Sequence, residues 1–195
     1  DSANSSRTPF EYGPQVALSK ASFFSETRDA FIDESVTFVE VDLDISTIRY
    51  FKNGVLLFAS EILAEGQDGS WWDAPSGLYK IEAVDERHFS TYTQAYFPWS
   101  ITFEGNYIIH GVPEYPDGSE VSENFLGGGV RLSTENAEKL FELVQLDIPV
   151  LVHKEPPATD SFVYEPVVPD ISVPHYLVAD LENGTILAAS DLHDA

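Results

Sequence analysis

The sequence predicts a mainly β fold, and three observations carry that prediction. Apolar and acidic residues alternate along residues 36–44, as they do in a half-buried strand. Asn53-Gly54 and Asn183-Gly184 each separate two apolar runs. Asn-Gly favours the two-residue turn of a β-hairpin, because both central residues of that turn have positive φ. Helical periodicity is found in two stretches, one near the N-terminus and one after three consecutive glycines.

In chain order, a first helix is followed by a series of strands. The spacing of Phe24, Phe31 and Ile32 predicts an amphipathic helix over residues 18–32. Ser133 is the expected N-cap of the second helix, with Glu135 in the first turn, where the helix dipole favours negative charge. The expected strands cover residues 36–44, 48–52, 55–63, 78–84, 88–90, 97–100, 103–109 (with a turn at 104–105) and 148–152.

Composition excludes several classes of partner and site. The 195 residues include 33 acidic and 10 basic side chains, for a net charge of −23. Nucleic acid is therefore not an expected partner, since phosphate binding needs a basic patch. There is no cysteine, which excludes disulfides and thiolate chemistry. The five histidines show no metal-ligand spacing, and the acidic loop 114–123 does not follow the calcium-loop pattern, so we expect neither a metal nor a cofactor.

Four segments are expected along the chain. Residues 1–35 are a leader and short helix, 36–153 a β domain, 154–174 a proline-rich linker or strap, and 175–195 a β-hairpin. The chain contains no methionine, so we expect its N-terminus to have been produced by a cut. No apolar run approaches the ~20 residues that a membrane span requires. The pattern does not indicate an oligomeric state.

Residues 106–141 carry a recognisable series of motifs. His110-Gly111 ends a strand pattern, and fifteen residues later the sequence reads Leu-Gly-Gly-Gly-Val-Arg over 126–131. This order resembles the active-site segment of the L,D-transpeptidase (YkuD-type) domain, in which His-Gly is followed by Ser-x-Gly-Cys-(Ile/Val)-Arg. The stretch Ala-Pro-Ser-Gly-Leu-Tyr over 74–79 is similar to the family's Thr-Pro-x-Gly-x-Tyr/Phe entry to a strand. The resemblance implies a β-sandwich with one helix after the active-site loop and a short N-terminal helix.

The resemblance also implies roles for individual residues. His110 matches the general base, and Gly128, Val130 and Arg131 match their motif positions. Gly129 stands where the family has its nucleophilic cysteine, and Leu126 stands where it has serine. The catalytic set is therefore vestigial. The substrate-binding residues expected beside it are Trp99, Tyr107, Gly127 and Gly128.

Each of these residues also has a simpler interpretation. His110 taken alone is an ordinary histidine at a strand end, and Arg131 is as well explained by a structural ion pair. The three glycines resemble a phosphate loop, but no Lys or Ser/Thr follows them as that loop requires. Trp71, Trp72 and Trp99 are more typical of a core or groove wall than of glycan contacts. Ser122, Ser133 or Thr134 is a conceivable substitute nucleophile, although Ser133 is better explained as a helix cap.

The expected function is that of a catalytically silent L,D-transpeptidase-like domain in peptidoglycan metabolism. It would be secreted, periplasmic or associated with the cell wall. It would bind a peptidoglycan stem peptide or an envelope protein, or position a peptidase domain. One alternative is an active transpeptidase or hydrolase that uses a non-cysteine nucleophile or water. Another is an accessory fragment of a two-domain protein, because residues 175–190 resemble the opening hairpin of serine D,D-peptidases.

Overall fold

The structure is a computed structural model that describes residues 11–66, 73–105, 107–122, 129–156, 177–179 and 186–189. The chain divides into two units, 1–156 and 157–195, which are described separately. In the described part of the first unit, ten strands form two sheets. The strand order is β1-β5-β10-β2-β3-β4 in the six-stranded sheet and β6-β7-β8-β9 in the four-stranded sheet.

The strands of the first unit are β1 (Gly13–Pro14), β2 (Phe38–Asp42), β3 (Thr47–Lys52), β4 (Val55–Glu61), β5 (Gly77–Lys80), β6 (Ala83–Ser90), β7 (Ala95–Glu104), β8 (Tyr107–His110), β9 (Val130–Arg131) and β10 (Pro149–His153). Its helices are the 3-10 helix η1 (Val16–Ser19) and the α-helices α1 (Ala21–Asp33) and α2 (Thr134–Leu143). Among the described strands, only β2 with β10 and β8 with β9 pair in parallel.

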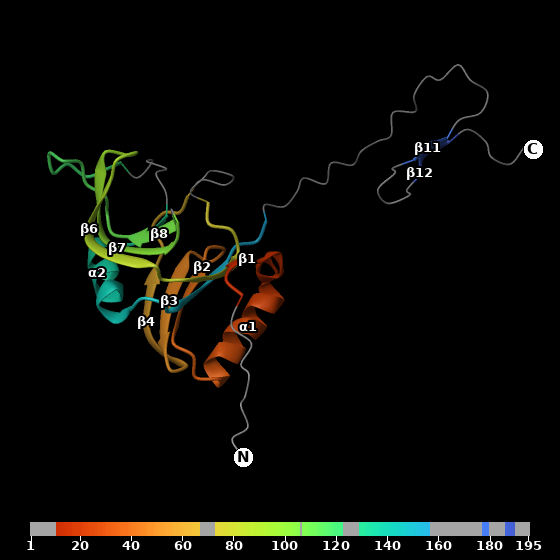
Figure 1. The fold of residues 1–195 in the computed structure, drawn as a ribbon, viewed down its shortest axis with the longest axis horizontal. Helices are drawn as coiled ribbons and strands as arrows, with labels where there is room; N and C mark the ends of the chain where they lie inside the picture. Colours follow the sequence, from red (N-terminus) through yellow and green to blue (C-terminus); the bar gives the residue numbers. More distant parts are fainter. Residues whose placement is uncertain are drawn as a thin grey trace, which may run out of the picture. The chain divides into compact units, whose positions relative to one another are not determined.

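The main hydrophobic core lies between the two sheets and α2. It takes Val39 and Val41 from β2, Ile101 and Phe103 from β7, and Leu140 from α2, all of them buried. Helix α1 packs on the other face of the six-stranded sheet, with Phe24 and Phe31 against Phe38. Figure 1 shows α1 beside β2 and β3, and α2 beside the sheet that contains β6 and β7. The fold is therefore mainly β with two α-helices, as the sequence predicts.

Strand β2 is buried on both faces, which the alternating pattern did not predict. All five of its residues are buried, including Glu40 and Asp42. Burial raises the pKa of Glu40, although the neighbouring Arg49 guanidinium, which contacts Glu40 Oε1, acts in the opposite direction. The strand is central in its sheet, and α1 covers the face on which Glu40 and Asp42 would otherwise be exposed to solvent. The expectation of a half-buried strand was therefore wrong.

The Asn53-Gly54 hairpin is confirmed. Asn53 and Gly54 have φ of +51° and +74°, and they join β3 to β4. A Cβ atom on Gly54 would lie 2.4 Å from the carbonyl oxygen of Ile32, at the end of α1. Glycine is therefore needed both for the turn and for the approach of the helix.

The expected single strand over residues 78–84 is two strands in different sheets. β5 ends at Lys80 and β6 begins at Ala83. Between them, the Ile81 N–H donates to Ile148 O while the Glu82 N–H donates to Thr102 O. The chain therefore passes from one sheet to the other within two residues, and continuous alternation in the sequence hides that step.

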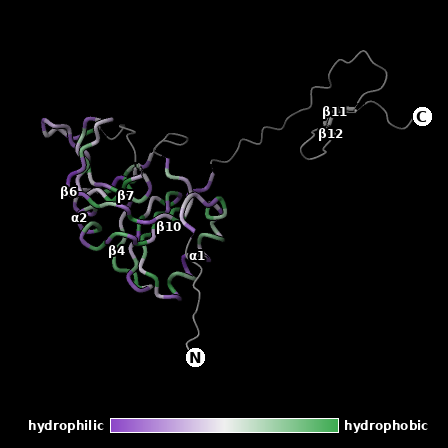
Figure 2. The backbone as a smooth tube through the Cα atoms, in the orientation of Figure 1, coloured by the Kyte–Doolittle hydropathy of each residue, from purple (hydrophilic) through white to green (hydrophobic). Residues whose placement is uncertain are grey.

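Helix α2 begins where the sequence predicts. The Ser133 hydroxyl accepts a hydrogen bond from the Asn136 N–H at 3.2 Å, and Glu135 lies in the first turn. In Figure 2 the outer part of β6 is hydrophilic, in agreement with the exposed side chains of that strand.

In the second unit, β11 (Leu177–Ala179) and β12 (Ile186–Ala189) pair antiparallel, with a register shift at Val178/Ala179. The turn expected at Asn183-Gly184 lies outside the described residues, as do residues 157–174 of the expected linker. Within the described part of the chain, neither α-helix has the length and apolar character that a membrane crossing requires.

Candidate functional site

His110 ends β8, at the point where β8 pairs in parallel with β9. Ile109 lies opposite Val130 and His110 lies opposite Arg131. The Leu132 N–H donates to the His110 carbonyl at 2.8 Å, which extends the pairing beyond the strand. The two halves of the motif, separated by fifteen residues in the sequence, are therefore adjacent in the fold.

The imidazole of His110 is held firmly. The side chain is 3% exposed, and its Nδ1 lies 2.6 Å from the carbonyl oxygen of Gly111. Because a carbonyl only accepts hydrogen bonds, Nδ1 carries the proton and donates it. The ring meets Phe97 edge to face, with the centroids 4.8 Å apart. This hydrogen bond fixes the orientation of the imidazole.

Gly129 lies beside this imidazole. A Cβ atom on Gly129 would be 3.2 Å from His110 Cδ2, so a side chain here would start next to the ring. The same Cβ would lie 2.2 Å from the carbonyl oxygen of Ile108 and 2.9 Å from its Cγ1. Gly129 also has a φ of +101°, which residues with a side chain rarely adopt. The backbone at position 129 is therefore in a conformation suited to glycine and not to cysteine.

Gly111 has a packing role in the His-Gly pair. A Cβ atom there would lie 3.0 Å from Thr134 Cα and 3.1 Å from Pro98 Cγ. The Gly111 N–H donates to Pro98 O at 2.8 Å, and the Val112 N–H donates to Thr134 Oγ1 at 3.2 Å. The chain after His110 thus passes tightly between β7 and the start of α2. Thr134, one of the conceivable substitute nucleophiles, accepts a backbone hydrogen bond in this passage, and Ser133 caps the helix.

Arg131 is fixed through its backbone on both sides. Its N–H donates to Ala64 O, and its carbonyl accepts from the Leu63 N–H, both at 2.8 Å. Its Nε is buried and has no acceptor among the described residues. No carboxylate in the described part of the chain forms an ion pair with Arg131. The structural ion pair considered from the sequence is therefore not found there.

The other expected site residues are placed differently. Trp99 packs against Phe141 of α2, with ring centroids 5.3 Å apart. The backbone φ of Trp99 is +54°. Tyr107 lies three residues before His110 and packs with Tyr79 and Phe103 on the core side of the sheet. Burial, followed by the charges of Asp73 and Glu104, raises the pKa of Tyr107. The structure does not bring either ring to His110. Leu126, Gly127, Gly128, Trp71 and Trp72 lie outside the described residues.

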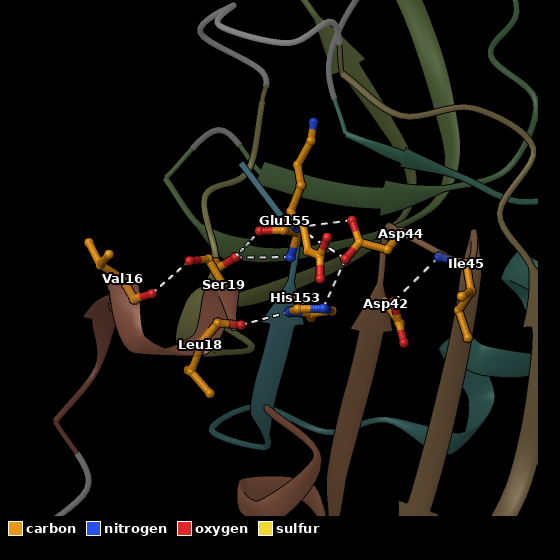
Figure 3. A network of polar contacts seen from close by, with 10 residues as sticks. Val16, Leu18, Ser19, Asp42, Asp44, Ile45, His153 and Glu155 are labelled. Carbon is orange, nitrogen blue, oxygen red and sulfur yellow. Dashed lines mark hydrogen bonds and ion pairs between the residues drawn. The ribbon is translucent and has the colours of Figure 1, made fainter. Parts of the chain in front are cut away.

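A second histidine cluster lies at the end of the other parallel strand pair. His153 ends β10 opposite Asp42, the last residue of β2, and Asp44 follows two residues later. His153 Nε2 lies 2.9 Å from Asp44 Oδ2, and Nδ1 lies 2.7 Å from the carbonyl oxygen of Leu18 (Figure 3). Sequence reasoning missed this cluster. Asp42 and Asp44 are recognisable at a strand end, but only the parallel pairing of β2 with β10 brings His153 to them.

Comparisons with known proteins agree with this architecture. The family model of the YkuD L,D-transpeptidase catalytic domain matches residues 37–152. Two solved structures are similar to the chain. An L,D-transpeptidase from Stackebrandtia nassauensis has 24% identity and a TM-score of 0.53, over 64% of this chain and 58% of that one. A fused Zn-dependent amidase/peptidase/peptidoglycan-binding domain-containing protein from Clostridium acetobutylicum has 12% identity and a TM-score of 0.51, over 66% and 58%.

This chain thus spans less than two thirds of either solved structure. A search of curated protein sequences found no match. The family match extends over more than half of the 195 residues, from β2 into β10, and includes both His110 and Gly129. The chain therefore belongs to the L,D-transpeptidase catalytic domain family.

Proposed function

We propose that this protein is a catalytically silent member of its family that binds peptidoglycan stem peptides without forming a covalent bond to them. One observation carries the proposal. The residue beside the His110 imidazole is Gly129. Its φ is +101°, and a Cβ atom added there would collide with Ile108 O, so a nucleophilic side chain does not fit. The histidine of the motif is kept, and the group that it would deprotonate is missing.

The chemical consequence follows from the loss of the nucleophile. Covalent acyl transfer needs a side chain that attacks the amide carbonyl and is later released. Glycine offers none, and there is no cysteine elsewhere in the chain to replace it. Removal of a nucleophile leaves only the residual catalysis that binding and backbone donors supply. Recognition of the peptide does not require the nucleophile, so it can persist.

The properties of Arg131 favour an anionic ligand, such as a peptide carboxylate. The chain carries 33 acidic and 10 basic residues, yet Arg131 forms no ion pair among the described residues. A guanidinium binds a carboxylate through two parallel hydrogen bonds, which gives both affinity and orientation. We therefore assign Arg131 the binding of a stem-peptide carboxylate near Gly129.

The proposal is tested by separating binding from turnover. The affinity of a tetrapeptide stem is measured by calorimetry for the wild type, Arg131→Ala and Arg87→Ala. Arg87 is the matched control, because it is exposed on β6 and pairs loosely with Glu114 at 3.9 Å. We expect Arg131→Ala to weaken binding by about tenfold or more, and Arg87→Ala to leave it unchanged. Mass spectrometry of muropeptides incubated with the wild type should show neither an adduct nor a cross-linked product.

Turnover would contradict the proposal. If wild-type protein cross-links or hydrolyses muropeptides and His110→Ala abolishes that activity, the protein is an enzyme that uses water or another nucleophile with His110 as base. If stem peptides do not bind at all, the ligand assignment fails although the chemical silence stands. The proposed place of action is the cell envelope. The other proposed partner is an envelope protein. A pull-down with intact sacculi distinguishes binding to peptidoglycan from binding to such a protein.

A further inference from the structure

We propose that Asp42, Asp44 and His153 form a binding site for one divalent transition-metal ion, with Zn²⁺ the best fit. One ligand atom from each of these side chains lies within 4.8 Å of the other two. The site is separate from His110 and Gly129, because it lies at the end of β2 and β10 in the other sheet. It does not depend on the proposed function.

The imidazole of His153 is presented as a metal ligand would be. Its Nδ1 donates to the Leu18 carbonyl at 2.7 Å, which leaves Nε2 facing Asp44 Oδ2 at 2.9 Å. Histidines that bind metals usually donate their other ring N–H to a carbonyl or carboxylate, since that bond fixes the tautomer and the ring. Phe24 stacks on the ring at 4.5 Å with an interplanar angle of 14°, and the side chain is 3% exposed. These contacts therefore fix the ring so that Nε2 points toward Asp44.

Asp42 provides an independent observation. Its side chain is buried, with 7% exposure, at the end of β2. Among the described residues its side chain accepts one hydrogen bond, a long one from the Ile45 N–H to Oδ1 at 3.4 Å, and no Lys or Arg there forms an ion pair with it. Buried carboxylates are normally paired or bound to metal.

Figure 3 shows the three side chains, with His153 joined to Asp44 and Asp42 joined to the Ile45 N–H. His153 comes from β10, Asp42 from the end of β2, and Asp44 from the turn that follows β2. Both oxygens of Asp44 also accept from the Glu155 N–H, at 2.9 and 3.1 Å. A bound ion would therefore tie the 3-10 helix η1, the turn after β2 and the end of β10 to one point.

The ligand set selects the class of ion. One imidazole nitrogen with two carboxylates suits Zn²⁺ and its neighbours among the transition metals, whereas Ca²⁺ takes six to eight oxygens. Tetrahedral ligands of zinc are about 3.3 Å apart. His153 Nε2 and Asp44 Oδ2, now 2.9 Å apart, would therefore separate slightly, and the widest separation of the set, at most 4.8 Å, would shorten by up to about 1.5 Å through rotation of the Asp42 side chain. Zn²⁺ takes the place of the Nε2 proton, which passes to the solvent, and water completes the coordination.

Calorimetry on the full 195-residue chain tests the site. The protein is prepared without a polyhistidine tag, stripped with chelator, and titrated with Zn²⁺ and separately with Ca²⁺ at physiological salt. We expect one Zn²⁺ per chain, bound in the micromolar range or tighter, against weak and diffuse Ca²⁺ binding to the acidic surface. Asp42→Asn and His153→Gln should each weaken the Zn²⁺ site by at least about tenfold. Asp42→Asn keeps the oxygen that accepts from Ile45.

His88→Gln is the matched control. His88 is an exposed histidine on β6, close in sequence to Asp85 and Glu86, and it should not change the Zn²⁺ site. ¹⁵N NMR of the wild type decides the question if a variant fails to fold, because Zn²⁺ should shift Nε2 of His153 alone among the histidines. Equal Zn²⁺ affinity in wild type, Asp42→Asn and His153→Gln would overturn the proposal. So would a Zn²⁺-induced shift at another histidine in place of His153.

Discussion

The two parallel strand pairs of this protein end in the same way and differ in what faces the ring. His110 ends β8 and His153 ends β10, and each side chain is 3% exposed. Each Nδ1 contacts a backbone carbonyl, and each ring packs on a phenylalanine. The His110 ring has Gly129 beside it, whereas His153 faces Asp44, with Asp42 close by.

This comparison shows that the end of a parallel strand pair can fix an imidazole in the same way while the neighbouring side chains differ. The scaffold of burial, carbonyl and aromatic contact fixes the ring in both places. The surroundings of the two rings differ in the side chains they offer. Beside the His110 ring lies Gly129, which has no side chain, whereas two carboxylates lie near the His153 ring. The following predictions test that contrast, from the largest expected effect to the smallest.

Removal of the two rings should have unequal effects on stability. We expect His153→Ala to lower the free energy of unfolding by about 3 kcal/mol, about 1 kcal/mol more than His110→Ala. Both variants lose a buried ring and its hydrogen bond to a carbonyl, and His153→Ala also removes the 2.9 Å contact with Asp44 Oδ2, which then keeps the Glu155 N–H. Urea denaturation in the presence of chelator measures both. Equal losses would show that the contact with Asp44 adds nothing.

A side chain at position 129 should lower the stability of the protein, because the backbone there has no room for it. We expect Gly129→Ala to cost about 2 kcal/mol, because it adds both a strained φ and a collision with Ile108 O at 2.2 Å. Gly118→Ala is the control, since Gly118 has a φ of +85° but nothing within 4 Å of the added Cβ. It should cost about 1 kcal/mol from strain alone. Thermal and urea denaturation compare the two, and equal costs would mean that position 129 tolerates a side chain.

Glu40 shares a face of β2 with Asp42 and should respond to pH in a defined direction. Burial raises its pKa above the ordinary value of 4.5, so the folded protein holds this proton more tightly than the unfolded chain. Its contribution to stability is then complete below about pH 4.5 and is lost as pH rises through the raised pKa. Relative to Glu40→Gln, the wild type should lose stability from acidic to neutral pH. A wild type that gains stability relative to Glu40→Gln as pH rises would contradict the burial argument.

Removal of the N-cap of α2 should lower the stability of the protein without changing the proposed metal site. Ser133→Ala removes the hydroxyl that accepts from the Asn136 N–H, and we expect a loss of about 1 kcal/mol. Ser133→Asp, which keeps a capping oxygen, should recover most of it. Zn²⁺ affinity measured by calorimetry should be the same in both variants, because Ser133 follows β9 of the four-stranded sheet whereas Asp42 and His153 end strands of the six-stranded sheet. A changed Zn²⁺ affinity would show that the two strand ends are coupled.

Much of the local structure could be predicted from the sequence because its causes are local. Asn53-Gly54 specified a hairpin, Ser133 specified a helix start, and alternation located most strands. The same alternation failed for residues 78–84, where the chain changes sheets between Lys80 and Ala83. It also failed to predict the burial of Glu40, because an acidic face looks exposed until α1 covers it.

By itself the sequence determined the mainly β class, the family motif around His110, and the presence of glycine at position 129. Only the tertiary structure decided that Gly129 lies in a conformation closed to a side chain, and that His153 meets Asp42 and Asp44 across more than a hundred residues. The reason is physical. Periodicity and turn chemistry act between neighbours along the chain, whereas a collision with a carbonyl or a converging set of ligands exists only after parallel strands have paired.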